Sequence, residues 1–464
     1  MKLYNTLTGV KEAFTPLNTA CTTIYSCGPT VYDYAHIGNC RAFLCADFLR
    51  RALRYRGYTV RHIMNITDVD DKTIKKAAAE NVSLKDITDR YTKAFLEDLA
   101  TLNIEPFDMF PHATEHIADM IALIEKLEHN GLTYVRNGSV YYSITKFKSY
   151  GALAKLDMEH MQDGAGASYT EFDEYEKENA KDFVLWKAKK EGEPSWESPW
   201  GEGRPGWHLE CSTMAMKYLG ETIDIHTGGT DLIFPHHTNE IAQSEGATGK
   251  PFVRYWLHNE FLLVEGEKMS KSKGNFYTVR SLTDSGIKPM TLRYLFLATH
   301  YRKPLNYSTA GLHHAAAAVD RIQNFYERIN DILIDGTSMA DITRFCTTAK
   351  TRFIEALDDD LNASEALAAV HDLITNLNKS ITNDTIAGSD KQLILETIHG
   401  FNAVFGILQE KDNTLDAEIE ALIQERDAAR KRKDFATADA LRNKLAAMGI
   451  QIMDSKHGMR WRRI

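Results

Sequence analysis

The sequence predicts an α/β protein in which a doubly wound parallel sheet carries an insertion and is followed by an α-helical bundle and a small C-terminal module. Apolar runs between turn signals predict four buried strands, at residues 22–27, 58–67, 223–227 and 254–264. Apolar residues at helical spacing predict helices from about Gly38, at 207–218, from about Asn239, at 315–332 and at 365–378. Strands that alternate with helices in this way are typical of a parallel sheet covered on both faces.

Residues 111–200 interrupt this alternation, with a predicted helix at 112–129 and short strands at 134–144, and we interpret them as an insertion. The C-terminal segment predicts one long charged helix at about 415–448, with Gly449 as its C-cap, and then a short strand. The sheet domain is predicted in two halves, at residues 1–110 and 201–260, with the insertion at 111–200 between them. A lysine-rich segment at 261–305, the helix bundle at 306–410 and the C-terminal module at 411–464 follow.

The composition is that of an ordinary globular protein, with 43% hydrophobic and 26% charged residues. No apolar run approaches the roughly 20 residues that a membrane-spanning helix needs, and the first residues lack the apolar core of a signal peptide. We therefore expect a cytoplasmic protein. Six cysteines in 464 residues are too sparse for a disulfide framework, so they are expected to be metal ligands or small buried groups.

Charge is distributed unevenly along the chain. The net charge is −9, but residues 424–464 contain eleven Lys/Arg and five Asp/Glu, a balance of +6 that leaves −15 for the rest. A basic end indicates a nucleic-acid contact, and a solvated helix face is the alternative.

The first chemical motif is His36-Ile37-Gly38-Asn39, between a predicted strand and a predicted helix. Phosphates bind well at helix N-termini, because free N–H groups and the positive end of the helix dipole meet there. Gly38 would let a base or ribose approach the backbone closely. His36 can donate a hydrogen bond to a phosphate oxygen whose charge grows during nucleotidyl transfer. Alone, a four-residue match of this kind is more often an ordinary turn before a helix.

The second motif is Lys268-Met269-Ser270-Lys271-Ser272, followed by Lys273, Gly274 and Asn275. Lysines flanked by hydroxyls and glycine form a loop that can reach a triphosphate and offset the charge on the departing pyrophosphate. A solvated basic loop is the alternative for this motif alone. The two motifs together, on one α/β body, favour nucleotide chemistry.

A third group consists of Cys27 at the end of the first strand, Cys211 on a helix, and His236 and Glu240. The last two are spaced i, i+4, which places them on one helix face, whereas the adjacent His237 is expected to point away from that row. Two thiolates, an imidazole and a carboxylate form a plausible zinc site. Scattered core or surface residues are the alternative.

The first two motifs resemble the HIGH and KMSKS signatures of class I aminoacyl-tRNA synthetases. Longer stretches resemble the cysteinyl-tRNA synthetase family over nearly the whole chain. These stretches are CGPTVYDYAHIGN (27–39), DFVLWK (182–187), PGWHLECS (205–212), GGTDLIFPHH (228–237), EKMSKSKGN (267–275), EALDDDLNASEAL (355–367) and GMRWR (458–462). Thr238, Lys273 and Glu260 depart from the family pattern, as does Asn39 in place of the second His of HIGH, a variant that occurs within the family.

The resemblance implies a Rossmann-like catalytic domain and a C-terminal anticodon-binding module. It implies activation of L-cysteine with ATP and its transfer to the 3′ end of tRNA(Cys), by a monomer with one Zn²⁺ per chain and Mg²⁺ accompanying ATP. The catalytic residues that it implies are His36, Asn39, Lys268 and Lys271. The ATP-binding residues are His36, Gly38, Asn39, Lys268, Met269, Ser270, Lys271 and Ser272. The metal ligands are Cys27, Cys211, His236 and Glu240. The cysteine-binding residues are Gly28, Thr30, Thr67, Trp207 and Asp231. The tRNA-binding residues are Arg426, Arg430, Lys433, Arg442 and Trp461.

A zinc ion would explain how such an enzyme selects cysteine over serine. An apolar pocket rejects an isostere only about 10²-fold, whereas soft thiolate binds zinc far better than a neutral hydroxyl. The insertion is too short for the hydrolytic editing domain that some synthetases carry, and a selective metal would make editing unnecessary. Two alternatives remain: a related ligase that joins cysteinyl-adenylate to an amino-sugar and lacks the basic C-terminal end, and a non-catalytic tRNA-binding paralogue, which would be expected to lose a motif or a ligand.

Overall fold

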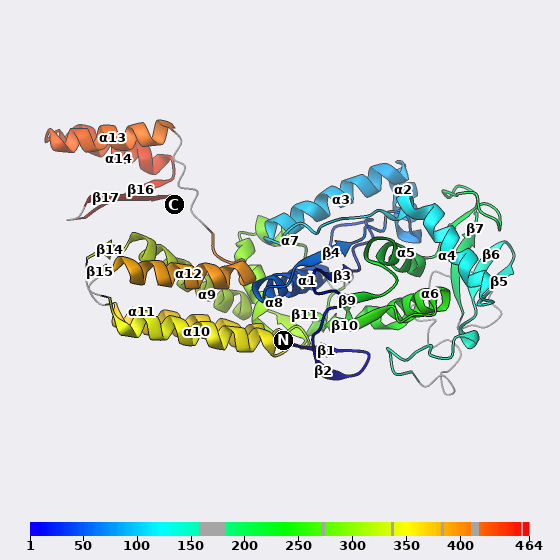
Figure 1. The fold of residues 1–464 in the computed structure, drawn as a ribbon. Coiled ribbons are helices and arrows are strands. Elements are labelled where there is room, and N and C mark those ends of the chain that lie inside the picture. The colour runs from blue at the N-terminus through cyan, green and yellow to red at the C-terminus, as the bar shows by residue number, and fades with distance from the viewer. Residues whose placement is uncertain are drawn as a thin grey trace. The chain divides into compact units, whose positions relative to one another are not determined.

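The structure is a computed structural model that describes residues 1–156, 182–270, 274–335, 338–381, 385–409, 417–455 and 458–463 (Figure 1). The chain divides into two compact units, Met1–Leu408 and Gln409–Ile464. Among the helices of the described ranges, none combines the length and the apolar character needed to cross a membrane.

A four-stranded parallel sheet forms the centre of the first unit. Its strands are β3 (Thr22–Ser26), β4 (Val60–Met64), β9 (Ile223–Gly229) and β10 (Val253–Asn259), in the order β10-β9-β3-β4. The crossover from β3 to β4 contains α1 (Ile37–Tyr55), and that from β9 to β10 contains α6 (Thr238–Thr248). These crossovers leave the middle of the sheet in opposite directions. The predicted doubly wound fold is therefore confirmed, with its switch point between β3 and β9.

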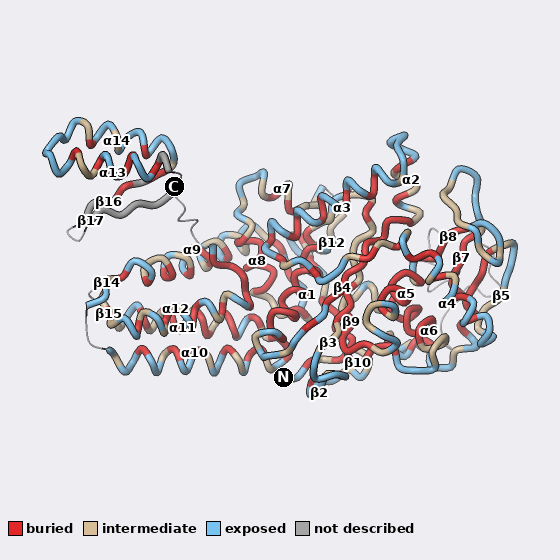
Figure 2. Tube along the Cα trace, turned by 45° about the horizontal axis from the view of Figure 1, so that its top comes forward, coloured by how far each residue is buried: buried red, intermediate tan, exposed pale blue. Residues whose placement is uncertain are grey.

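Helices cover both faces of the sheet. Successive strand side chains point to opposite faces, so Ile24 of β3 packs in the core that includes α1, whereas Tyr25 packs in the core of α4 (Ile117–His129) and α5 (Trp207–Leu219). The strands are buried along most of their length in Figure 2. Polar side chains of this sheet can therefore meet a ligand only near the strand ends.

Polar caps determine where several helices begin. His36, Asp70, Ser83 and Thr278 each accept a backbone hydrogen bond in a capping box at the first turn of a helix. The helices that follow them are α1, α2 (Asp71–Glu80), α3 (Leu84–Thr101) and α7 (Val279–Asp284). The cap of α1 is the first residue of the HIGN motif, so the motif and the start of the helix coincide.

The insertion carries its own antiparallel sheet, in the order β5-β6-β7-β8. The strands are β5 (Thr133–Arg136), β6 (Ser139–Tyr142), β7 (Phe183–Ala188) and β8 (Gly203–Pro205). The predicted helix at 112–129 begins as a 3₁₀ turn at Ala113–His116 and continues as α4.

The strand predicted at 254–264 is wrong as a single element, because the chain leaves the central sheet after Asn259. The Glu260 N–H donates to the Tyr301 carbonyl, and the buried Arg41 guanidinium donates to the Glu260 carbonyl at 2.6 Å. The next strand, β11 (Leu262–Val264), belongs to a separate three-stranded sheet with β12 (Glu267–Lys268) and β13 (Leu305–Tyr307). The segment continues through α8 (Pro289–Ala298).

Four long helices follow and confirm the helical region. They are α9 (Thr309–Asp331), α10 (Ala340–Asp358), α11 (Ala363–Ser380) and α12 (Gly388–Phe405), and they run side by side in Figure 1. A two-stranded pair, β14 (Leu333–Ile334) with β15 (Thr385–Ile386), joins their far ends. The bundle shares a continuous core with α1 and α8, so it is part of the first unit rather than a separate body.

An N-terminal hairpin was not predicted. It consists of β1 (Lys2–Asn5) and β2 (Val10–Ala13), and its Asn5 side chain accepts the Trp256 N–H and donates to the Arg254 carbonyl. These bonds cover the exposed edge of β10.

The second unit contains two helices and a hairpin. The single helix predicted at 415–448 is wrong, because it divides into α13 (Ala417–Lys431) and α14 (Phe435–Ala447). Lys433 takes a left-handed conformation (φ 61°), and Asp434 caps α14 through the Thr437 N–H. The strands β16 (Ile450–Ser455) and β17 (Gly458–Arg463) pair antiparallel, so the predicted short strand is one half of a hairpin.

Candidate active site

Four metal-ligating side chains meet at the carboxyl edge of the sheet, near its switch point. Cys27 directly follows β3, Cys211 lies on α5, and His236 and Glu240 come from the turn and helix after β9. Their ligand atoms all lie within 4.8 Å of one another. The two Sγ atoms are 3.7 Å apart, and His236 Nε2 lies 3.2 Å from Glu240 Oε1. The structure thus brings together all four residues that the sequence predicted as ligands.

The geometry of this cluster fits a cation with tetrahedral coordination. Two sulfurs that each lie about 2.3 Å from zinc in a tetrahedral site are about 3.8 Å apart, close to the 3.7 Å between Cys27 and Cys211. His236 Nε2 is buried and makes no hydrogen bond in the described structure, although it faces the Glu240 carboxylate. A ring nitrogen, a carboxylate and two sulfurs crowded into one small volume are stabilised by a cation between them.

The protonation states of the cluster agree with this fit. Burial lowers the pKa of His236 to about 3, so its imidazole is neutral and offers a lone pair. Burial raises the pKa of both Cys27 and Cys211 above that of an ordinary thiol, and only a nearby positive charge would ionise them at neutral pH. Two further histidines hold the ligands in place: His208 Nδ1 lies 2.8 Å from His236 Nδ1, and His226 Nε2 lies 2.9 Å from Glu240 Oε2.

The expectation that His237 points away from this cluster is wrong. His237 Nε2 lies 3.3 Å from Cys27 Sγ and 3.9 Å from Glu240 Oε1. The prediction considered only the i, i+4 row of Glu240, but His237 is spaced i, i+3 from Glu240, and this spacing also brings side chains together on a helix. Cys27, His226, His237 and Glu240 consequently form a second set whose ligand atoms lie within 4.8 Å of one another.

The two sets differ in what else their members bind. His237 Nδ1 lies 2.7 Å from His258 Nε2, and His258 Nδ1 lies 2.8 Å from Thr6 Oγ1. One ring nitrogen of His226, Nε2, is already hydrogen-bonded to Glu240 Oε2. The first set alone contains both thiols, which are the softest ligands present and favour zinc.

The HIGN and KMSKS motifs lie next to each other. The Met269 side chain packs against Gly38, because a Cβ atom added at Gly38 would come within 3.3 Å of Met269 Cε. The KMSKS segment therefore contacts the start of α1. Beyond the loop, the Tyr277 carbonyl accepts the Ile37 N–H at 3.0 Å, and the Phe276 ring contacts His36 edge-on. Two segments more than 200 residues apart thereby form one wall of the site.

The sequence predicted that free N–H groups at the start of α1 would bind phosphate, but the N–H groups of Gly38 and Asn39 are already hydrogen-bonded. His36 Nδ1 accepts hydrogen bonds from the N–H groups of Gly38 and Asn39 at 3.1 and 3.2 Å. Because Nδ1 is an acceptor, the proton of a neutral His36 ring is on Nε2, which is the donor that a phosphate oxygen needs. The Asn39 side chain in turn accepts the His36 N–H.

The described part of the KMSKS loop is anchored by Asn275. Its Oδ1 accepts the Ser270 N–H at 2.8 Å, and its Nδ2 donates to the Lys268 carbonyl at 3.2 Å. Lys268 is exposed, with its Nζ 5.1 Å from the centre of the Phe261 ring. Lys271 and Ser272, which the sequence predicted as ATP-binding, lie outside the described residues.

The five predicted cysteine-binding residues surround the same edge. Gly28 passes so close to β4 that an added Cβ would overlap the Asn65 carbonyl oxygen, and Thr30 pairs with Thr67 in a parallel bridge. The Trp207 ring lies 4.3 Å from that of His236 and is 38% exposed. Asp231 follows β9 and is also exposed, and an added Cβ at Gly229 would overlap its carboxylate.

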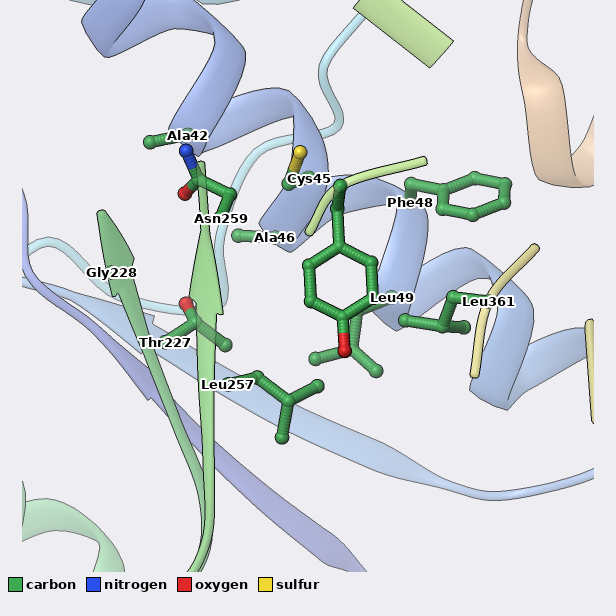
Figure 3. Close-up of a pocket in the computed structure, with 11 residues that line it drawn as sticks. Ala42, Cys45, Ala46, Phe48, Leu49, Thr227, Gly228, Leu257, Asn259 and Leu361 are labelled. Carbon is green, nitrogen blue, oxygen red and sulfur yellow. The ribbon is translucent and has the colours of Figure 1, made fainter. Parts of the chain in front are cut away.

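Beneath this edge, a small cavity separates α1 from the ends of β9 and β10 (Figure 3). Ala42, Cys45 and Ala46 face Thr227 and Leu257 across it. Its volume of about 20 Å³ holds about one water molecule and no substrate. The chemistry therefore lies above the sheet edge rather than in this cavity.

Two of the residues that depart from the family pattern are accommodated. Thr238 Oγ1 donates to the Ile233 carbonyl at 2.7 Å and so closes the turn before α6. Glu260 uses its backbone groups to leave the sheet, as described above. Lys273 lies outside the described residues.

The predicted tRNA-binding residues of the second unit differ in accessibility. Arg430 and Arg442 on the two helices and Lys433 between them are exposed. Arg426 is only 2% exposed and lies 3.8 Å from Asp427, so the structure does not present its guanidinium to RNA. Trp461 is in β17 opposite Ile452, but its side chain lies outside what the structure describes.

Sequence reasoning missed several buried groups of the site. His226, Asn65 and Glu210 each contact a predicted site residue, and His258 contacts His237. His226 could have been found, because its position on β9 puts it on the sheet face shared with Tyr25. Asn65 and Glu210 carry no spacing signal, since their partners lie on other elements.

Comparison with known families covers most of the chain. The family model described as "tRNA synthetases class I (C) catalytic domain" matches residues 13–317, and the "DALR domain" matches 352–409. The "Cysteinyl-tRNA ligase anticodon binding domain" matches residues 412–462.

Relatives of similar length extend the comparison. The chain is 49% identical to "Cysteine--tRNA ligase" of Leptospira interrogans serogroup Icterohaemorrhagiae serovar Lai, over 100% of the chain and 99% of the relative. It is 48% identical to the protein of the same name from Solibacter usitatus, over 100% and 99%. Among solved structures, Mycobacterium tuberculosis methionyl-tRNA synthetase in complex with methionyl-adenylate has a TM-score of 0.60 at 16% identity, over 83% of this chain and 90% of that one, and so shares the fold. The chain therefore belongs to the cysteine–tRNA ligase family of class I aminoacyl-tRNA synthetases, which are ATP-dependent ligases.

Proposed function

We propose that the chain activates L-cysteine with ATP and transfers the cysteinyl group to the 3′ end of tRNA(Cys). The observation that carries this proposal is the cluster of Cys27, Cys211, His236 and Glu240 at the carboxyl edge of the sheet, where the HIGN segment also follows β3. A soft, thiol-rich metal site next to a nucleotide-binding motif suits a substrate that is itself a thiol.

Cys27, Cys211, His236 and Glu240 would hold the zinc ion. When bound, zinc supplies a soft Lewis acid that favours the substrate thiolate over a serine hydroxyl. His208 and His226 orient two of the ligands, and Trp207 lies against the His236 ring at the exposed side of the cluster. The cysteine side chain would therefore enter beside Trp207.

The activation step joins the cysteine carboxylate to the α-phosphate of ATP and releases pyrophosphate, with Mg²⁺ accompanying the nucleotide. His36 Nε2 donates a hydrogen bond to a phosphate oxygen, and its orientation is set by the two backbone N–H groups on Nδ1. Lys268 and Lys271 offset charge on the departing pyrophosphate. Asn275 ties both sides of the loop that carries them.

Transfer to tRNA depends on the second unit. Arg430, Lys433 and Arg442 supply exposed positive charge for phosphates, and Trp461 would stack on an unpaired anticodon base. The anticodon-domain match at 412–462 supports tRNA over the amino-sugar acceptor of the alternative ligase. We propose that the enzyme works as a monomer in the cytoplasm.

Pyrophosphate exchange with each of the 20 amino acids tests the activation step. Exchange with cysteine and at most a trace with serine is expected. Attachment of cysteine to a tRNA(Cys) transcript, and none to glucosamine-type acceptors, tests the second step. Exchange with another amino acid, or cysteine transfer to the amino-sugar, would contradict the proposal.

A further inference from the structure

A buried hydrogen-bond chain leads from the backbone of Gly28 to Glu210. The Gly28 N–H donates to Asn65 Oδ1 at 2.9 Å, and Asn65 Nδ2 donates to Thr67 Oγ1 at 3.2 Å. Thr67 Oγ1 then donates to Glu210 Oε2 at 2.6 Å. Asn65, Thr67 and Glu210 are all at most 1% exposed.

The direction of the first two bonds in this chain is fixed by its first member. A backbone N–H can only donate, so the oxygen of the Asn65 amide must face Gly28 and its NH₂ group must face Thr67. The Thr67 oxygen therefore accepts from Asn65. Its own proton goes to Glu210 Oε2, which accepts it as an unprotonated carboxyl oxygen. One lone pair on that oxygen remains, and no further hydrogen bond reaches it within the described ranges.

We infer that Glu210 is a positioning residue that makes Thr67 an acceptor, so that Thr67 binds the ammonium group of the substrate amino acid and not its carboxylate. The inference rests on the proposed function, because it concerns the orientation of cysteine in the same site. A hydroxyl whose proton is already donated to a buried carboxyl offers nothing to a carboxylate ligand, whereas an ammonium has three protons to give.

The position of Glu210 agrees with this role. It lies one residue before Cys211 in the first turns of α5, so the same helix carries a metal ligand and the group that orients Thr67. Its other carboxyl oxygen, Oε1, is buried and has no hydrogen-bond partner in the described structure. A carboxyl group buried with one oxygen unsatisfied costs stability, which points to a role beyond packing.

Two substrate fragments separate the ends of the amino acid. Cysteamine keeps the thiol and the ammonium, and 3-mercaptopropionate keeps the thiol and the carboxylate. Both are measured as competitive inhibitors of cysteine-dependent pyrophosphate exchange by the full-length, zinc-loaded enzyme. In Glu210→Ala, the KM for cysteine and the inhibition constant of cysteamine should rise about tenfold, the value for losing an oriented hydrogen bond to a charged group. The inhibition constant of 3-mercaptopropionate and the KM for ATP should stay within about twofold.

Four further variants keep the test independent of folding defects. Glu210→Gln retains a carbonyl acceptor and should restore near-normal cysteamine inhibition, and Thr67→Val should reproduce the Glu210→Ala pattern, with no added loss in the double variant. Glu245→Ala is the matched control. It removes a carboxylate of α6 that accepts the Phe252 N–H, and it should leave the inhibition constants of both fragments unchanged.

Weaker inhibition by 3-mercaptopropionate with normal cysteamine inhibition, in Glu210→Ala or Thr67→Val, would overturn the inference, because Thr67 would then donate to the carboxylate. Equal increases in the inhibition constants of both fragments and in the KM for ATP would also overturn it, because Glu210 would then have a structural role. So would additive effects on the cysteamine inhibition constant in the double variant. Failure of the wild-type enzyme to exchange pyrophosphate with cysteine is a separate result that refutes the proposed function instead.

Discussion

Asp47 on α1 and Arg293 on α8 form an ion pair at 2.8 Å in which both side chains are completely buried. Asp47 also pairs with Arg50 and Arg51 of its own helix at 3.0 and 2.8 Å. Arg293 donates to the Phe405 carbonyl at the end of α12. One carboxylate thus organises the arginines that join the sheet domain to the helix bundle.

Asp47→Asn should destabilise the first unit by about 3–5 kcal/mol, because it leaves buried guanidinium groups without their counter-charge. The free energy of unfolding, measured by urea denaturation monitored by circular dichroism, checks this value. Asp89→Asn removes an exposed partner of Lys85 and should change stability by less than about 0.5 kcal/mol. Similar small losses for both variants would contradict the central role of Asp47.

The same carboxylate predicts a pH dependence. Burial alone would raise the pKa of Asp47, but the Arg293 and Arg51 guanidinium groups outweigh it and lower the pKa below the ordinary value. A lowered folded-state pKa stabilises the protein above the unfolded-state pKa of about 3.9, and this contribution is lost as the pH falls through the folded-state value. The stability difference between wild type and Asp47→Asn should therefore be constant from pH 7 to about pH 5 and shrink at lower pH. A difference that grows as the pH falls would refute the assignment.

Zinc should be present at about one atom per chain, and Cys211→Ala should lose most of it, because two thiolates dominate the affinity for a soft metal. Metal analysis by mass spectrometry gives the content. Cys21→Ala, at a cysteine outside the cluster, is the matched control and should retain zinc. His236→Ala should lose zinc more severely than His237→Ala, and the reverse order would identify the second ligand set as the metal site.

Lys271→Ala should slow cysteinyl-adenylate formation by on the order of 10²–10³ while the affinity for cysteine changes little. The lysine acts on charge that develops in the transition state, so its loss appears in kcat rather than in ground-state binding. Pyrophosphate exchange at varied cysteine gives both parameters. Lys288→Ala, at an exposed lysine paired with Asp320, serves as the control. An equal loss of cysteine affinity would make the loop structural instead.

A chain ended after Leu408 should still exchange pyrophosphate with cysteine but charge tRNA poorly. It keeps the bundle, whose Phe405 carbonyl holds Arg293, whereas a cut near residue 305 would remove that contact. In the full chain, Trp461→Ala should weaken tRNA binding by about 1–3 kcal/mol if the indole stacks on a base, without affecting cysteine activation. Both half-reactions are measured on each variant. Normal charging by Trp461→Ala would assign that residue to packing.

The sequence by itself determined the family, the α/β class and the candidate chemistry. Local signals sufficed for these, because strand and helix periodicity, the HIGN and KMSKS motifs and the i, i+4 spacing of His236 and Glu240 are short-range features. Their residue types made Cys27 and Cys211 candidate ligands, and the resemblance to the family assigned them that role. Their Sγ atoms lie 3.7 Å apart across 184 residues.

Only the tertiary structure decided the contacts that depend on how distant segments pack. His237 joins the cluster through Cys27, which follows a different element of the fold and whose Sγ lies 3.3 Å from His237 Nε2. Lys433 ends what the charge pattern predicted as one helix, since a left-handed residue leaves no trace in periodicity. The direction of the Thr67 hydroxyl follows from Gly28, Asn65 and Glu210, which lie on separate elements. A sequence records each residue's preferences, but hydrogen-bond direction and the pairing of buried charges are set by the partners that folding brings within reach.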